Sequence, residues 1–356
     1  ENVVNNIKEN DFYLYWIMKS GDAMEVYSIV KSLKKKFPKS KHIAGGTHID
    51  MLQDETSKIF DSIIVGPGEE SFYQAISENC KRNIYSQDYK KLPFSNTPYP
   101  LRNFLPEKNI INNKMFKQYG DLKSTMVYFS RGCFYNCSYC VYNVPNQLQS
   151  KNNDLISQEI GYLKKNYNVE AILLKDEIAL NPNKKIFYSQ MEAIGNENII
   201  WRGQTTSVGT EEHLRIAKET GCVELSVGIE TVDNDVMKFI NKKWQNETII
   251  KKFLENAKKY GIKVKICLIF GLPGEPRNIV EKTINFIKDQ KPDYVSLSGF
   301  CPFPGSPIYN DPEKYGIKKI DKNWDNHAHL LYRFSNEELV GIPFEYHEKA
   351  SWGKTF

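Results

Sequence analysis

The chain has 356 residues and a formal net charge of +5, with 40% apolar and 13% aromatic residues. That length accommodates a (β/α) barrel together with a smaller domain, and the aromatic content argues against a disordered chain. The positive charge comes from 41 Lys and only 7 Arg, which are scattered along the sequence. We therefore expect a solvated, Lys-rich surface and no nucleic-acid partner.

Segments for export or membrane insertion are not expected. The chain has no run of about 18 apolar residues, which a membrane-spanning helix needs. Its first residues have neither the basic nor the apolar region of a signal peptide. Seven Cys are an odd number in a long chain, which argues against a disulfide framework. Together these features predict a protein of the reducing cytoplasm.

Strand-like and helix-like segments alternate along the chain, beginning with an apolar-aromatic run at residues 11–18 and a helical pattern at residues 23–37. Two further strand-like runs end in glycine turns, Gly45-Gly46 and Gly66-Pro67-Gly68. This alternation predicts a small, incomplete doubly wound (Rossmann-like) domain over residues 1–80. Residues 81–122 carry four Pro and no sustained period, and they are interpreted as a linker.

Six β/α repeats follow between residues 123 and 307. They predict a parallel, curved sheet with helices outside it, a partial (β/α)6 form of the eight-fold TIM barrel. In such a sheet the chemistry lies at the carboxyl ends of the strands. Residues 308–356 are interpreted as a C-terminal cap in which Trp324, His327, His329 and Trp352 form no recognisable pocket. The predicted strands are residues 125–130, 170–174, 199–202, 223–228, 263–270 and 294–299.

Three Cys follow the first strand of the predicted barrel within eight residues, at Cys133, Cys137 and Cys140. Thiolates spaced C-x3-C-x2-C on a loop suit a 4Fe–4S cluster, with three irons held by the protein and the fourth open to another ligand. A structural zinc site needs four protein ligands, and no further Cys or His lies within about twenty residues of this loop. The spacing therefore favours the cluster.

This cysteine motif, with the aromatic Tyr139 before its last Cys, resembles that of the radical S-adenosylmethionine (SAM) superfamily. The resemblance covers roughly residues 123–307. It implies an enzyme in which the open iron binds SAM, the reduced cluster breaks the C5′–S bond, and a 5′-deoxyadenosyl radical removes a hydrogen atom from the substrate. It also implies an external one-electron reductant, such as a flavodoxin-like or ferredoxin-like protein.

Residues at the predicted strand ends match SAM-binding positions of that superfamily. Asp176 and Glu177 follow the second strand, where the amino group of SAM is held, and Arg202 ends the third, where a guanidinium could pair with the carboxylate. By the resemblance, Glu230 contacts SAM after the fourth strand. The alternative for each carboxylate is a solvated or helix-capping role. For Glu275 this alternative and SAM binding are equally favoured. The implied SAM-binding residues are Tyr139, Asp176, Glu177, Arg202, Glu230, Phe270 and Gly271.

The two glycine turns near the N-terminus resemble the second half of the cobalamin-binding domain that precedes many such barrels. Glycines there would let the backbone approach the nucleotide tail of the cofactor, so we expect bulk at Gly46 or Gly68 to block it. No Asp-x-His-x-x-Gly motif supplies a His to cobalt, and His48 is interpreted as a tail-contacting or surface residue. The implied cobalamin-binding residues are Gly45, Gly46, Thr47, His48, Gly66, Gly68 and Glu69.

These resemblances predict a cobalamin-dependent radical SAM methyltransferase that acts on an unactivated carbon of a small molecule or peptide. One alternative is a radical SAM enzyme that rearranges or cyclises its substrate without methyl transfer. A second is a tRNA methylthiotransferase, but that family carries further Cys in its N-terminal domain, whereas residues 1–122 hold only Cys80. A third is a non-catalytic nucleic-acid-binding module with a structural metal, against which the scattered Lys argue.

Overall fold

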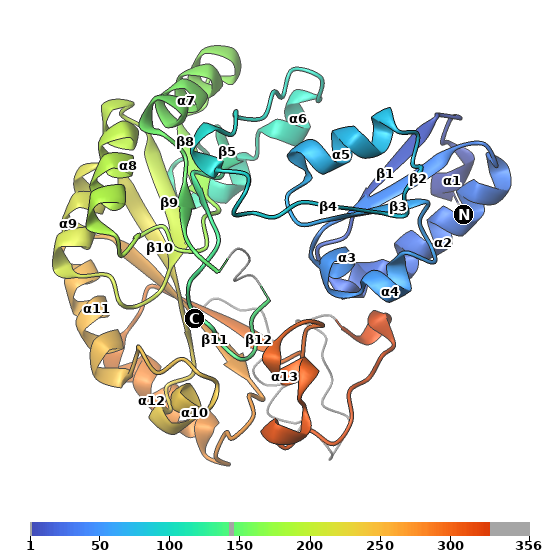
Figure 1. Cartoon of the computed structure of the whole chain (residues 1–356). Coiled ribbons are helices and arrows are strands. Elements are labelled where there is room, and N and C mark those ends of the chain that lie inside the picture. Colours follow the sequence, from blue (N-terminus) through green and yellow to red (C-terminus); the bar gives the residue numbers. More distant parts are fainter. Residues whose placement is uncertain (1, 142–145, 328–356) are drawn as a thin grey trace. The chain divides into compact units, whose positions relative to one another are not determined.

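The computed structural model describes residues 2–141 and 146–327, which divide into two compact units. The four-stranded unit comprises residues 2–92, 138–141 and 299–327, and the six-stranded unit comprises residues 93–137 and 146–298. Each unit has its own main sheet (Figure 1). No helix in the described part of the chain is long and apolar enough to cross a membrane.

The four-stranded unit is built on a parallel sheet in the order β1-β2-β3-β4. Successive residues of β3 face opposite sides, so Ile63 packs with α2 and α3 while Ile64 packs with α5. Helices therefore cover both faces, which confirms the predicted doubly wound domain. The elements are α1 (Asn2–Asn5), β1 (Phe12–Trp16), η1 (Ser20–Asp22), α2 (Ala23–Lys36), β2 (Lys41–Gly45), α3 (Thr47–Met51), α4 (Gln53–Thr56), β3 (Ser62–Val65), α5 (Gly68–Ser77) and β4 (Ile84–Ser86).

Residues 299–327 complete the core of the four-stranded unit. Trp324 is only 4% exposed and lies in the same apolar cluster as Ile17. Its indole nitrogen donates a hydrogen bond to Glu55 Oε1 at 2.8 Å, and the Tyr27 hydroxyl donates to the same oxygen at 2.9 Å. The segment contains α13 (Pro307–Asn310) and the 3-10 turns η4 (Glu313–Tyr315) and η5 (Trp324–Asn326).

The boundaries of the units differ from the predicted domain boundaries. The predicted linker, residues 81–122, contains β4, which pairs with β3, and its later part forms η2 (Phe94–Asn96), α6 (Glu107–Ile110) and η3 (Asn113–Tyr119). The prolines limit the length of these elements without preventing them. Residues 299–307, predicted to end the barrel, group instead with the four-stranded unit. Residues 328–356 of the predicted cap, with His329 and Trp352, lie outside the described residues.

The six-stranded unit has a curved sheet in the order β12-β11-β10-β9-β8-β5, and its paired strands from β5 to β11 run parallel. Helices α7, α8, α9, α11 and α12 lie along its outer side (Figure 1). The predicted partial barrel is therefore confirmed. The elements are β5 (Ser124–Val127), β6 (Ser130–Arg131), β7 (Gln149–Ser150), α7 (Asn153–Tyr167), β8 (Ala171–Leu174), α8 (Lys184–Asn196), β9 (Ile200–Thr205), α9 (Glu211–Glu219), β10 (Cys222–Glu230), α10 (Asn234–Phe239), α11 (Glu247–Lys259), β11 (Lys263–Phe270), α12 (Ile279–Gln290) and β12 (Tyr294–Gly299).

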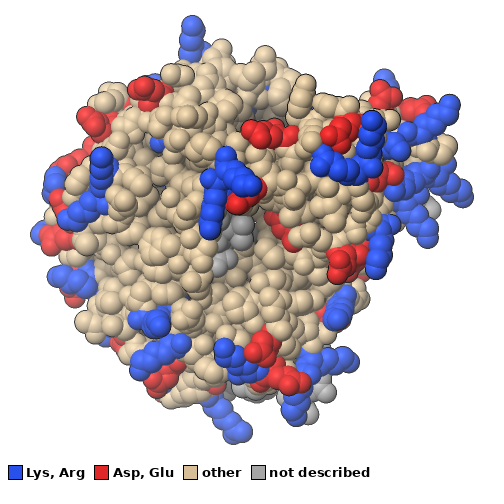
Figure 2. Space-filling model, in the orientation of Figure 1, with Lys and Arg blue, Asp and Glu red and all other residues tan. Residues whose placement is uncertain are grey.

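Side chains alternate across this sheet and give it an apolar and a polar face. Trp201, Val227 and Ile266 belong to the core that the helices cover, whereas intervening positions such as Ser226 and its register partner Lys265 are only partly buried. The polar face is the inner one, and the ligands of a barrel bind at the carboxyl ends of its strands. On the surface, Lys and Arg are interspersed with Asp and Glu over most of the face shown in Figure 2.

Candidate active site

The cysteine loop begins directly after β6 in the six-stranded unit. Gly132 has φ +86°, a left-handed conformation that lets the backbone turn sharply into the loop. None of the three cysteines of the motif forms a disulfide within the described residues. Burial, with smaller contributions from the nearby Cys137 and Glu177, raises the pKa of Cys133 to about 11. A thiolate there would therefore need a bound cation, which is what a cluster iron supplies.

The donor set of this loop fits a cluster by chemistry, although the three thiols do not form a preformed metal site. Among residues 2–141 and 146–327, no three His, Cys, Asp or Glu side chains are grouped so that they could hold a metal ion. Three thiolates in this spacing are nevertheless the donor set that a 4Fe–4S cluster takes.

The two carboxylates after β8 have different environments. Asp176 is 3% exposed and accepts hydrogen bonds from the Phe129 backbone N–H at 2.8 Å and the Ser130 hydroxyl at 2.6 Å. These bonds fix the end of β5 and favour a structural role for Asp176, while its predicted contact with SAM stays a prediction. Burial raises the pKa of Glu177 to about 7, and its carboxylate accepts a hydrogen bond from the Gly132 backbone. Glu177 therefore lies beside the start of the cysteine loop.

Arg202 does not lie at the end of its strand, because β9 continues to Thr205. Its guanidinium pairs with Glu224 Oε1 at 3.4 Å, and Glu224 also accepts hydrogen bonds from Gln118 at 2.6 Å and Tyr119 at 3.2 Å. Those two residues belong to η3, which packs on the amino-terminal half of the sheet. Arg202 thus belongs to a buried polar floor, which favours a structural role over the predicted pairing with the SAM carboxylate; no contact among the described residues tests that pairing.

Glu230 ends β10 in a strained conformation. Its φ of +63° is rare for a residue with a side chain and costs on the order of 1 kcal/mol. The strand pairing shifts register between Gly228 and Glu230. A Cβ at Gly228 would lie only 2.5 Å from Glu230 Oε1, so the carboxylate folds back over the glycine. Strain of this kind is typical of functional positions, which agrees with the predicted role of Glu230.

The turn after β11 is stabilised by Glu275, which lies within it. Phe270 is 6% exposed and its side chain packs in the core, while its predicted place in the adenine-side turn stays a prediction. The Gly271 backbone N–H donates to Glu275 Oε2 at 2.7 Å. Burial raises the pKa of Glu275 to about 8. Because α12 begins only at Ile279, Glu275 braces the turn and does not cap the helix.

Several buried polar atoms near these strand ends lack a hydrogen-bond partner among the described residues. They are Glu177 Oε2, Glu275 Oε1 and the indole nitrogen of Trp244. Trp244 stacks on Tyr135 of the cysteine loop, with ring centroids 4.0 Å apart. Buried polar groups are normally paired, so a polar ligand such as SAM would satisfy atoms that the chain leaves open.

A second candidate site is an apolar pocket of about 260 Å³ in the four-stranded unit. It lies at the carboxyl ends of β1, β2 and β3, where doubly wound domains bind ligands. Gly46 has φ +107°, and a Cβ there would lie 2.6 Å from the Ile17 carbonyl oxygen, so this glycine is required by the backbone. The pocket is lined by Leu14, Tyr15, Trp16, Ile43, Ala44, Gly45, Gly46, Ile64, Gly66, Gly68 and Phe72.

The polar residues predicted around this pocket do not line it. His48 is 2% exposed, with Nδ1 2.9 Å from the Ser20 hydroxyl and Nε2 2.6 Å from the Tyr27 hydroxyl. Burial lowers the pKa of His48 to about 4. His48 is therefore a neutral core residue, so the predicted surface role is wrong, while the predicted contact with the cobalamin tail stays a prediction. Thr47 contacts the Met18 sulfur, and Glu69 is exposed in the first turn of α5.

Asp50, which the sequence did not single out, supports the backbone next to this pocket. The Asp50 carboxylate accepts a hydrogen bond from the Gly66 backbone N–H at 2.9 Å. Asp50 lies in α3, directly after the first glycine turn, so it ties the two predicted turns together. Burial raises its pKa to about 6.

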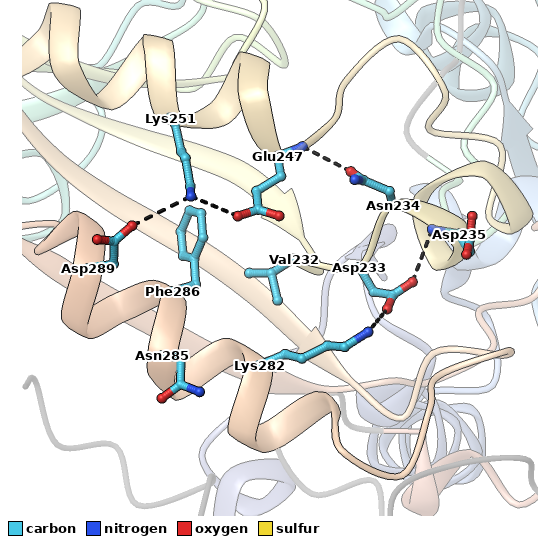
Figure 3. A pocket seen from close by; sticks show the side chains of 10 residues that line it. All are labelled: Val232, Asp233, Asn234, Asp235, Glu247, Lys251, Lys282, Asn285, Phe286 and Asp289. Carbon is cyan, nitrogen blue, oxygen red and sulfur yellow. Dashed lines mark hydrogen bonds and ion pairs between the residues drawn. The ribbon is translucent and has the colours of Figure 1, made fainter.

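A further pocket, of about 570 Å³, lies beside α10, α11 and α12 (Figure 3). Its charged residues pair with one another, as shown by Lys251 with Glu247 at 2.9 Å and Lys282 with Asp233 at 2.7 Å. These are partly exposed surface pairs, and none of the predicted SAM- or cobalamin-binding residues lines the pocket. It is therefore not part of the candidate active site.

Comparison with known proteins identifies the larger unit. Residues 127–287 match the family model described as the radical SAM superfamily. The chain contains a radical SAM domain. This radical SAM domain extends from the end of β5 into α12. It includes all three cysteines of the motif as well as Glu177 and Glu230.

Some sequence relatives align with most of the chain, beyond the residues that the family model matches. An uncharacterised methyltransferase of Pyrococcus horikoshii is 24% identical over 360 aligned residues, covering 94% of this chain and 77% of the relative. A bacteriochlorophyllide d C-12(1)-methyltransferase of Chlorobaculum tepidum is 24% identical, covering 84% of this chain and 65% of the relative. The chain therefore spans about two thirds to three quarters of these relatives.

A solved structure shows the same fold. The radical SAM methyltransferase TsrM from Kitasatospora setae, determined with cobalamin and a 4Fe–4S cluster bound, matches with a TM-score of 0.69 at 14% identity. The match covers 90% of this chain and 70% of TsrM, so it includes elements of both units.

Proposed function

We propose that this chain is a cobalamin-dependent radical SAM methyltransferase acting on an unactivated carbon. The observation that carries the proposal is the combination of a radical SAM domain with a doubly wound unit whose glycine turns border an apolar pocket. Relatives named as methyltransferases, and the TsrM structure with cobalamin and a cluster, support the same activity.

Cys133, Cys137 and Cys140 would hold the cluster. When bound, the cluster supplies the electron that breaks the C5′–S bond of SAM. Glu177, beside the cysteine loop, would accept a hydrogen bond from SAM, and a nearby cation would favour its carboxylate form. Glu230 and the Gly271 turn border the same carboxyl ends of the strands, and Tyr139 remains a proposed contact through the resemblance alone.

The pocket of the four-stranded unit would take the nucleotide tail of cobalamin. When bound, cobalamin carries the methyl group between a first SAM and the substrate. Trp16 and Leu14, 73% and 57% exposed, offer apolar surface to a flat aromatic group, and the Gly45 and Gly68 backbones permit close approach. None of the residues lining the described pocket is a His, so these residues supply no imidazole to cobalt.

The substrate class that we propose is a small molecule or peptide, and the reductant is a flavodoxin-like or ferredoxin-like protein. Methyl transfer to an unactivated carbon needs a carbon radical on the substrate, so water and stray hydrogen donors must be kept from it. The relatives include a methyltransferase named for a bacteriochlorophyllide, but nothing among the described residues singles out that substrate.

The proposal is tested on anaerobically reconstituted full-length chain. We expect close to four irons per chain, formation of 5′-deoxyadenosine from SAM under reduction, and retention of the corrin absorbance after incubation with hydroxocobalamin and desalting. Zinc in place of iron would overturn the radical SAM assignment. Iron with no retained corrin would leave a cobalamin-free radical enzyme, and a product without an added CH2 would favour rearrangement or cyclisation.

The cobalamin pocket has its own test. A Cβ at Gly68 meets only Ile64, at 3.8 Å, so Gly68→Val fills the pocket without a backbone clash. We expect this variant to lose corrin retention while it still cleaves SAM. Tyr73→Val on the same helix is the control, because Tyr73 is 74% exposed and lies outside the pocket. Equal corrin retention in both variants would contradict the proposed pocket.

A further inference from the structure

The loop between α10 and α11 contacts the cysteine loop and the end of β10 at the same time. Asn241 donates a hydrogen bond from its side chain to the Asn136 carbonyl at 2.6 Å, and Trp244 stacks on Tyr135. Both of those partners lie between Cys133 and Cys137. Residues 241–245, the 241–245 loop, therefore hold the backbone that carries two cluster ligands.

The same loop secures the last residues of β10. Gln245 is 2% exposed; its amide donates to the Ile229 carbonyl at 2.7 Å and its oxygen accepts from the Ser207 hydroxyl at 2.7 Å. Lys242 is equally buried, with a side chain 3% exposed. Its ammonium donates to the Gly228 carbonyl at 2.8 Å and to Glu230 Oε1 at 3.0 Å.

A buried Lys in this arrangement has a specific consequence for Glu230. Removing an ammonium from water is costly unless it is paired, so the position of Lys242 is fixed by the two oxygens that it contacts. Glu230 in turn adopts φ +63°, a conformation that persists only where the surroundings impose it. Lys242 bonds both to the carboxylate and to the strand residue over which that carboxylate folds.

We propose that Lys242 is a positioning residue that fixes the Glu230 carboxylate for SAM, and that the 241–245 loop thereby couples the SAM-binding acid to the cysteine loop. This inference rests on the proposed function, in which Glu230 contacts SAM. In this proposal Lys242 acts on SAM through Glu230, and its charge also acts on Cys133 of the cysteine loop. The relative position of Glu230 and the cysteine loop matters, because SAM must contact the cluster iron and Glu230 at the same time.

The test compares Lys242→Met with Lys243→Met in full-length, anaerobically reconstituted protein. Met keeps the length and apolar stem of the side chain and removes its charge, and Lys243 is the exposed neighbour. We expect Lys242→Met to raise the dissociation constant for SAM about tenfold or more, since one charge-assisted contact is misplaced. Iron content should stay close to four, Lys243→Met should bind SAM as the parent does, and Lys242→Arg should recover part of the loss.

A double-variant cycle separates this inference from the proposed function. If Lys242 acts through Glu230, the pair Lys242→Met and Glu230→Gln should bind SAM no more weakly than Glu230→Gln alone. This pair also removes both buried charges, so it stays informative if Lys242→Met fails to fold. Additive losses would overturn the positioning role. A parent-like affinity in Glu230→Gln would instead contradict the proposed SAM contact of Glu230.

Discussion

The two units present their candidate sites in opposite ways. In the four-stranded unit the pocket is apolar, and glycines at the strand ends shape it through the backbone. In the six-stranded unit the strand ends are polar, and charged side chains such as Glu177 and Glu230 are held by hydrogen bonds and ion pairs. A backbone-built site is readable from glycine spacing, whereas a site built from side chains depends on which face of the sheet each residue occupies.

The largest effect is expected in the cysteine loop. Cys137→Ala should abolish reductive SAM cleavage, because three thiolates hold three irons of a 4Fe–4S cluster and two do not hold it stably. The measurement is 5′-deoxyadenosine formed by the reconstituted variant. Cys80→Ala, which changes a cysteine of the other unit, should leave cleavage intact. If Cys137→Ala cleaved SAM as the parent does, the six-stranded site would not be a cluster site.

A comparison of Gly46 and Gly68 tests the pocket of the four-stranded unit, which the backbone shapes. The sequence alone predicts that bulk at Gly46 blocks cobalamin selectively, but a Cβ there would collide with the Ile17 carbonyl at 2.6 Å and the φ is +107°. We expect Gly46→Val to cost at least about 3 kcal/mol of unfolding free energy. Gly68→Val, without those clashes, should change it by less than about 1 kcal/mol. Urea unfolding followed by circular dichroism distinguishes the two, and equal losses would refute the distinction.

The polar floor of the six-stranded unit is expected to contribute to stability alone. Arg202→Met leaves Glu224, whose side chain is 3% exposed, without its ionic partner, and should destabilise the protein by roughly 2–4 kcal/mol. SAM affinity should stay unchanged. Adding Glu224→Gln should restore much of the stability, because both charges are then gone. A selective loss of SAM affinity would return Arg202 to the binding site.

A smaller, pH-dependent effect is expected at Asp50. Its folded-state pKa is raised from 3.8 to about 6, so between those values the folded protein keeps a proton that the unfolded chain has released. The contribution of Asp50 to stability therefore falls as the pH rises through this range. Asp50→Asn can still accept the Gly66 hydrogen bond, and it should stabilise the protein by about 1–3 kcal/mol above pH 6. Unfolding measured at pH 4 and pH 8 should show the gain only at pH 8.

The smallest effect is expected at the pocket of Figure 3. Lys251 is 37% exposed and pairs with Glu247 and Asp289 on the helical surface. Lys251→Met should change the unfolding free energy by less than about 1 kcal/mol and leave SAM affinity and corrin retention as in the parent. A large change in either ligand affinity would mean that this pocket takes part in the reaction.

The fold was predictable because the hydrophobic periodicity of a strand or helix depends only on residues that are close in sequence. The six strands of the barrel and the three strands of the small sheet before residue 66 lie where their apolar runs predict them. Strand β4, by contrast, has only three residues, Ile84–Ser86, which is too short a run to stand out among the prolines that follow it. The radical SAM motif was predictable because its three Cys are close in sequence.

The site residues were less predictable, because strand ends and alternation decide them. Arg202 lies inside β9, which runs on to Thr205, and Asp176 accepts hydrogen bonds at the end of β5; neither environment is visible in the sequence. Lys242 and Trp244 belong to no motif. They reach the site from a loop that follows the strand by more than ten residues, which only the folded chain brings back to Glu230 and Tyr135.

Trp324 belongs to the core of the four-stranded unit, so that core can be completed only after Trp324 has been synthesised. Glu55, its partner, leaves the ribosome early, whereas Trp324 follows 269 residues later. At roughly 5–20 residues per second the first four strands would wait tens of seconds for the side chain that fills their core. In that interval the nascent unit exposes apolar surface of the kind that chaperones bind. A fragment ending before residue 299 should therefore be aggregation-prone, even though it retains every strand of both sheets except the last residue of β12.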